Sequence, residues 1–118
     1  MTKSEFYQAL AASGIATCYF EWKDTPPAMP WLCWLIVGTS PEAADNRATA
    51  EISDVRLELY TKTRDFTSEA IVDGILASLE LVPVKSEEWL EDTSCWLVTY
   101  EMDVLFEAEQ QEGENNNG

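Results

Sequence analysis

The sequence predicts an α+β fold, a two-layer sandwich in which two helices pack on one face of a mostly antiparallel sheet of about four to five strands. Residues 52–60 and 95–106 alternate between apolar and polar side chains, which is typical of strands with one buried face. Residues 3–13 and 66–79 space their apolar side chains as helices do. The expected order is helix, three strands, helix and two strands, and the short links favour antiparallel pairing.

The first helix is predicted over Lys3 to Ser13. Thr2 and Glu5 have the spacing of a capping box, and Gly14 follows as a residue that ends helices. A first strand is expected over residues 16–22. Two adjacent prolines beyond it can neither continue a central strand nor permit a helix before them, so a loop should follow.

A long hairpin of two strands is predicted next. Residues 31–39 are apolar on both faces, as in a strand that is covered on both sides, so this segment is expected to be the central strand. Turn-forming residues fill 40–50, and the hairpin tip at Asp45 and Asn46 should project. The next strand should direct one set of residues into the core, namely Ile52, Val55, Leu57 and Leu59, and leave another set on a free face, namely Asp54, Arg56, Glu58 and Tyr60.

The second helix should be capped by Asp65 or Thr63. Its apolar residues recur at roughly helical spacing, although Gly74 lowers its helix propensity. The core stripe is therefore predicted to comprise Phe66, Ile71, Ile75 and Leu79, with Val72 and Leu76 beside it.

The C-terminal half should end in two strands joined by an acidic turn. Residues 81–86 are expected to form a short strand, and residues 87–94 the turn that holds Trp89 and Leu90. Trp89 is either a flap folded onto the sheet edge or an exposed anchor for a partner. The last strand should place one set on its inner face, namely Trp96, Val98, Tyr100, Met102, Val104 and Phe106.

Charge and composition exclude several classes of protein. The 118 residues include 22 acids and 7 bases, a net charge of -15, so nucleic-acid binding through phosphate neutralisation is not expected. A 46% apolar content indicates one globular domain, expected over 1–106, followed by an acidic, Asn-rich disordered tail at 107–118. Three cysteines in apolar runs, and the lack of a signal peptide or membrane span in the sequence, predict a soluble cytosolic protein.

Catalytic chemistry is not predicted. Histidine, the commonest general base and metal ligand, is missing, and the five glycines stand too far apart for a phosphate-binding loop. The neighbouring acids at 87–88 and 91–92 could in principle work as acid and base or hold a divalent cation, but a solvated turn explains them at this density of acids. No cofactor, metal or catalytic residue is therefore assigned.

Several segments, in their order and spacing, resemble a known family over about residues 15–106. The chain is similar to the small tail-completion proteins of long-tailed phages and prophages of Gram-positive bacteria, which in turn resemble the lambda-type tail terminators. One departure from the pattern is Trp34, where Tyr is more usual. The similarity is carried by Thr25 to Pro27, Pro30 and Trp31, Ala44 to Asn46, Val55 to Thr61 with Asp65, Lys85 to Glu91, and Val98 to Val104.

The resemblance implies a non-enzymatic virion protein, present in the host cytoplasm during assembly and then in the virion tail. It implies a ring, commonly of six copies, that caps the tail tube, stops its polymerisation and offers a surface to the head connector. The partners would be other copies of this chain, the major tail-tube protein and a head-connector protein. Residues expected at such an assembly interface are Asp45, Asn46, Arg47, Arg56, Glu58, Tyr60, Trp89 and Leu90.

A second function class stays open. A small, acidic, aromatic-rich protein can imitate the phosphate array of DNA and inhibit a host nuclease or restriction enzyme. Such a mimic needs acids spaced along an exposed face, whereas 6 of the 22 acids lie after Tyr100 and mostly in the predicted tail. Binding to a tail-tube protein or to a nuclease would discriminate the two classes.

Overall fold

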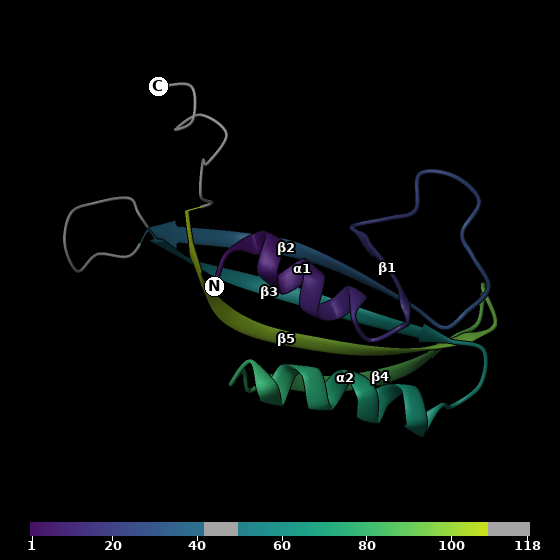
Figure 1. Cartoon of the computed structure of the whole chain (residues 1–118). Coiled ribbons are helices and arrows are strands. Elements are labelled where there is room, and N and C mark those ends of the chain that lie inside the picture. The colour runs from purple at the N-terminus through teal and green to yellow at the C-terminus, as the bar shows by residue number, and fades with distance from the viewer. Residues whose placement is uncertain (42–49, 109–118) are drawn as a thin grey trace.

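The computed structural model describes residues 1–41 and 50–108, and it confirms the predicted α+β fold. Figure 1 shows an elongated, twisted sheet with two helices against it. The elements in chain order are α1 (Lys3–Ala11), β1 (Ala16–Tyr19), β2 (Trp31–Pro41), β3 (Ala50–Thr61), α2 (Phe66–Ser78), β4 (Val84–Leu90) and β5 (Cys95–Glu107).

The five strands form one mixed sheet in the order β1-β2-β3-β5-β4. The pairs β2–β3, β3–β5 and β5–β4 are antiparallel, whereas β1 and β2 are parallel. The prediction that residues 31–39 form the central strand is wrong, because β3 occupies the middle of the order and β2 lies beside it. The predicted coverage of both faces is confirmed, since Trp34 packs under α1 while Cys33 is buried on the opposite face.

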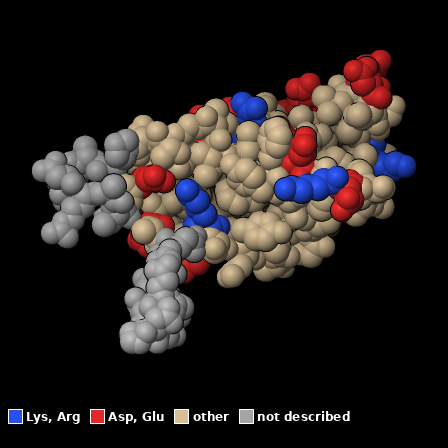
Figure 2. Space-filling model, turned by 90° about the horizontal axis from the view of Figure 1, so that it is seen from above, with Lys and Arg blue, Asp and Glu red and all other residues tan. Residues whose placement is uncertain are grey.

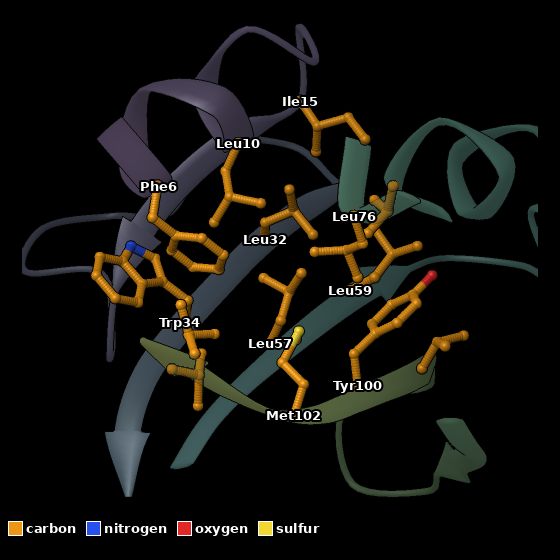
Figure 3. Packing of buried hydrophobic residues seen from close by; sticks show 14 of the residues in the cluster. Phe6, Leu10, Ile15, Leu32, Trp34, Leu57, Leu59, Leu76, Tyr100 and Met102 are labelled. Atoms are coloured by element: carbon orange, nitrogen blue, oxygen red, sulfur yellow. The ribbon is translucent and has the colours of Figure 1, made fainter. Parts of the chain in front are cut away.

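Both helices contribute to one core on the same face of the sheet, which confirms the two-layer arrangement. Figure 3 shows Phe6 and Leu10 of α1 and Leu76 of α2 above the side chains of the sheet. The strand register aligns the inward side chains in rows across β2, β3 and β5. Two such rows are Leu32–Leu59–Val98 and Trp34–Leu57–Tyr100.

The inward face of β3 differs from the prediction at Ile52. Side chains alternate along a strand, so Ile52 cannot share a face with Val55, and its side chain is 39% exposed on the outer face. Ser53 takes the inward position instead and is fully buried, where its hydroxyl is within 3.2 Å of that of Thr39. Val55, Leu57 and Leu59 are fully buried as predicted.

The start of α1 follows the predicted capping box. The Thr2 hydroxyl accepts a hydrogen bond from the Glu5 amide at 3.1 Å, and the Glu5 carboxylate accepts one from the Thr2 amide at 2.8 Å. These two bonds satisfy amides that the helix leaves without partners. The helix ends at Ala11, two residues before the predicted end.

Asp65 caps α2, as one of the two predicted alternatives, by accepting a hydrogen bond from the Ser68 amide at 2.9 Å. The predicted stripe is wrong in part, because Phe66 is 69% exposed and Ile71 also faces solvent. The buried face of the helix is rotated from the predicted one. It comprises Ser68, Glu69, Val72 and Leu76, with Ile75 and Leu79 packed against the core.

The predicted acidic turn at 87–94 is wrong over its first half. Strand β4 covers 84–90 and pairs with β5 from Val84↔Glu101 to Leu90↔Cys95, so only residues 91–94 reverse the chain. An edge strand has one face and one side in solvent, and it therefore accepts the charges that suggested a turn.

The predicted hairpin tip and the predicted C-terminal tail lie wholly or mostly outside the residues that the structure describes. β2 and β3 form the expected hairpin, but Asp45, Asn46 and Arg47 lie outside the described residues. The predicted tail begins at Glu107, which instead ends β5 and donates its amide to the Met1 carbonyl at 2.9 Å. Residues 109–118 lie outside the description.

Candidate assembly interface

The outer face of β3 carries three of the predicted interface residues in a row. Arg56, Glu58 and Tyr60 are spaced two apart, so they point to the side of the sheet opposite the core. Each is half-buried. Arg56 forms an ion pair with its cross-strand partner Glu101, with 2.9 Å between Nη2 and Oε2. In this row the Arg56 charge is paired within the chain, and the Glu58 carboxylate accepts a hydrogen bond from Tyr60.

Tyr60 links this row to an aromatic cluster. Its hydroxyl donates a hydrogen bond to Glu58 at 2.9 Å, and its ring lies 4.5 Å from that of Trp31. Trp22 closes the cluster with an edge contact to Trp31 at 6.0 Å. Burial raises the pKa of Tyr60, and the hydrogen bond to Glu58 raises it further, so the phenol stays protonated at neutral pH.

Trp89 and Leu90 lie on opposite faces of the edge strand β4. Trp89 is on the helix side, where its ring makes an edge contact with Trp96 at 5.6 Å and its indole N–H donates to Glu91 at 3.2 Å. Its side chain packs onto the sheet and is 41% exposed, and its role as an anchor for a partner stays a prediction. Leu90 is on the outer face, paired with Cys95. The predicted set is therefore divided between two faces.

The lateral edges of the sheet expose apolar side chains that the sequence prediction did not assign to an interface. At the β4 edge, Val82 is 89% exposed and Val84 is 75% exposed. At the β1 edge, the exposed apolar side chains are those of Tyr7, Tyr19 and Phe20. Tyr7 and Tyr19 line the same pocket, and Phe20 follows Tyr19 in the chain. The signal for the β4 edge was the sequence Val-Pro-Val at 82–84, in which apolar residues flank a proline next to a charged strand.

The β1 edge contains a shallow aromatic hollow between α1 and β2. A pocket of about 500 Å³ is lined by Tyr7, Tyr19, Trp34 and Ile36 with the polar residues Lys3 and Ser4. Tyr19 is held in place because its hydroxyl accepts a hydrogen bond from the Ile36 amide at 3.1 Å. Its ring also makes an edge contact with Trp34 at 4.8 Å. This hollow is a preformed apolar surface.

A charge network attaches β4 to α2. The carboxylate of Glu69 is nearly buried and is bound by the Lys85 ammonium and by Arg64, the latter at 2.7 Å. Burial opposes ionisation of Glu69, but the hydrogen bonds from Lys85 and Arg64 prevail and lower its pKa. Asp73 adds a second contact to Lys85 at 3.2 Å. The network holds the β4 edge in a fixed position.

The visible surface carries charges of both signs. Figure 2 shows acidic side chains spread over the face seen from above, with lysine and arginine side chains set among them and large uncharged areas between. Across residues 1–41 and 50–108, no three His, Cys, Asp or Glu side chains are grouped to hold a metal ion. None of the helices in this part of the chain has the length and apolar character needed to cross a bilayer.

Comparisons with known proteins show a likeness of fold but no sequence match to a known family. No protein-family model matches the chain, and no curated protein sequence matches it. Among solved structures, a chain of the virion of a native gene transfer agent (GTA) particle is similar, with a TM-score of 0.60 and 17% sequence identity. The alignment covers 86% of this chain and 91% of that chain. The two chains therefore share a fold over nearly their whole lengths.

Proposed function

We propose that this protein is a structural component of a phage or phage-like particle, in which it caps the tail tube as a ring, stops tail polymerisation and forms the head-tail joining surface. The observation that carries the proposal is the fold shared with a chain of a gene transfer agent virion over 86% of one chain and 91% of the other. The resemblance of residues 15–106 to phage tail-completion proteins supports the same role independently.

A ring needs two different surfaces on each copy, because each copy meets its neighbours through heterologous contacts. The β1 edge and the β4 edge lie at opposite ends of the strand order, and both expose apolar side chains. In the proposed ring, Val82 and Val84 of one copy pack against Tyr19 and Phe20 of the next. In this arrangement the half-buried row of Arg56, Glu58 and Tyr60 lies on a surface of the ring and outside the contact between neighbouring copies.

Charge suits this role in two ways. Six copies would carry 6 × -15 = -90 charges, so the ring would not retain DNA that passes through it. The same repulsion disfavours ring closure by free copies in dilute solution at low ionic strength. We therefore expect a free monomer that assembles on the end of the tail tube. Light scattering of the purified protein at low and high salt tests this, and a stable hexamer at low salt would contradict it.

Deletion of the gene from the phage or prophage that encodes it tests the function. The expected lysate contains filled heads separate from tails of irregular, excessive length in electron micrographs, and a plasmid copy of the gene restores joined particles. Joined particles with tails of normal length in the deletion strain would overturn the proposal. A pull-down from the same lysate identifies the partner, since the DNA-mimic alternative requires a nuclease and the proposed role requires the tail-tube protein.

Single charges at the two edges test the proposed ring contacts. Val84→Glu and Phe20→Glu each place a charge at an exposed position, so the monomer should fold while joined particles are lost in complementation. The matched control is Leu105→Glu, which adds the same charge to an exposed apolar residue on the outer face of β5. Circular dichroism checks folding, and equal complementation by all three variants would exclude the edges as contacts.

A further inference from the structure

Two of the three cysteines lie side by side on adjacent strands. Cys18 of β1 and Cys33 of β2 are register partners in the parallel pair, and their Sγ atoms are 3.0 Å apart. Both are free thiols. The third cysteine, Cys95, is also free and has a different neighbour, since its Sγ is 3.2 Å from the Thr93 hydroxyl.

The two thiols differ in exposure. Cys33 is buried, with 3% of its surface exposed, whereas Cys18 is half-buried and lines an open pocket of about 550 Å³. Trp22, Lys23 and Pro27 also line that pocket. A small reagent can therefore reach Cys18 from solvent, and the buried Cys33 is in contact with it.

We propose that Cys18 and Cys33 form a redox modification site, a dithiol that a small-molecule disulfide such as oxidised glutathione converts to an intramolecular disulfide. The Cys18 thiolate attacks one sulfur of the reagent, forming a mixed disulfide and releasing one thiolate of the reagent. Cys33, deprotonated in turn, attacks the Cys18 sulfur and displaces the second thiolate of the reagent. Two protein thiols are oxidised, one reagent disulfide is reduced to two thiols, and the two protons pass to the leaving thiolates.

The geometry favours the bridge over competing products. A disulfide bond is about 2.0 Å long, so the sulfurs need to approach by about 1 Å, which side-chain rotation can supply. The second step is intramolecular, with the attacking sulfur already in contact, so the mixed disulfide should not accumulate. The bridge would join β1 to β2 and close the loop that carries Trp22 and the adjacent prolines Pro26 and Pro27.

Thiol acidity sets the rate. Burial raises the pKa of Cys18, and burial together with the Cys18 contact raises the pKa of Cys33. Because the thiolate is the nucleophile, exchange should be slow at neutral pH and faster in mildly alkaline solution. The reduced form is expected inside a reducing cytosol and the bridged form after release to an oxidising exterior. This timing, unlike the chemistry, depends on the proposed function.

Incubation of the folded full-length protein with oxidised glutathione, followed by alkylation in denaturant and mass spectrometry, tests the site. The wild type should lose two of its three alkylatable thiols and the mass of two hydrogen atoms, with a peptide link between Cys18 and Cys33. Cys95→Ser is the matched control and should form the same bridge. Cys18→Ser and Cys33→Ser should form no intramolecular bridge.

A stability measurement gives a second readout. The closed loop of about 15 residues should raise the Tm of the oxidised protein by on the order of 10 °C, reversibly on addition of dithiothreitol. Three free thiols after prolonged oxidation at alkaline pH, a link that involves Cys95, or a Tm that does not rise would overturn the proposal. The test does not depend on virion assembly, so its failure would leave the proposed function standing.

Discussion

The guanidinium of Arg64 binds the carboxylate of Glu87 with two hydrogen bonds, from Nε at 3.2 Å and from Nη2 at 2.8 Å. Arg64 precedes α2 and Glu87 lies in the edge strand β4, so this pair joins two elements that are far apart in sequence. The same Nη2 also donates to the nearly buried Glu69 at 2.7 Å. The edge strand β4 is thus attached to the sheet by its ladder with β5 and to the helix layer by these ion pairs.

Arg64→Ala should lower the free energy of unfolding by about 1–3 kcal/mol, because it removes a hydrogen-bonding partner from Glu69 in a site where water has little access. Arg56→Ala is the matched control, since the Arg56–Glu101 pair is substantially exposed and should contribute less than about 1 kcal/mol. Urea unfolding of both variants measures the difference. Equal losses would show that the network around Glu69 contributes no more to stability than the exposed Arg56–Glu101 pair.

Acid should weaken the same region. The pKa of Glu69 is lowered by Lys85 and Arg64 against the effect of burial, and the pKa of Asp65 is lowered by its hydrogen bonds from Ser68. A carboxylate whose folded pKa lies below its unfolded value stabilises the fold above the unfolded pKa, and that stability is lost as pH falls through the folded one. The loss should therefore begin within the ordinary carboxyl range and be complete only below it.

The remaining acids complicate a simple pH titration, because protonation also relieves their mutual repulsion at a net charge of -15. The comparison is therefore between the wild type and Glu69→Gln, which keeps the shape of the side chain. The wild type should be more stable at neutral pH, and the difference in unfolding free energy should shrink as the pH falls. A difference independent of pH would contradict the assigned ionisation of Glu69.

The parts of the fold that depend on local periodicity were predictable from the sequence. The inward residues of β3 from Val55 to Leu59 and those of β5 follow from two-residue alternation, and the caps at Thr2 and Asp65 follow from short-range hydrogen bonding. The outward position of Ile52 was also predictable from alternation. Its even number places it on the face opposite the odd-numbered Val55, Leu57 and Leu59.

The other errors arose from tertiary contacts that the sequence does not display. Glu69 occupies the buried face of α2 because Arg64 and Lys85 supply its partners from other elements, so the helix can turn Phe66 outward. The charged residues of β4 resemble those of a solvated turn. They are compatible with a strand here because β4 lies at the sheet edge, a position that the sequence does not display. The contact between Cys18 and Cys33 requires the parallel register of β1 and β2, which no local pattern indicates.

The two faces of β3 can be compared with one substitution type. Leu57→Asp should unfold the protein, because a fully buried leucine is replaced by a charge without a partner, at a cost of at least about 3 kcal/mol. Ile52→Asp changes an apolar residue of the same strand on the exposed face and should retain a cooperative unfolding transition. Circular dichroism and thermal melting distinguish them. Comparable stability of the two variants would show that the face assignment is wrong.

Two glycines should respond in opposite directions to the same substitution. Gly74 lies within α2, and a Cβ built there meets no atom within 4 Å, so Gly74→Ala should stabilise the protein by about 1 kcal/mol through higher helix propensity. Gly14 ends the α1 segment at a φ of +83°, which L side chains rarely adopt. Gly14→Ala should therefore destabilise the protein by about 1–2 kcal/mol, although the space around it is also open. Thermal unfolding should raise the Tm for the first variant and lower it for the second. A shift of the same sign in both would mean that backbone conformation does not govern these two positions.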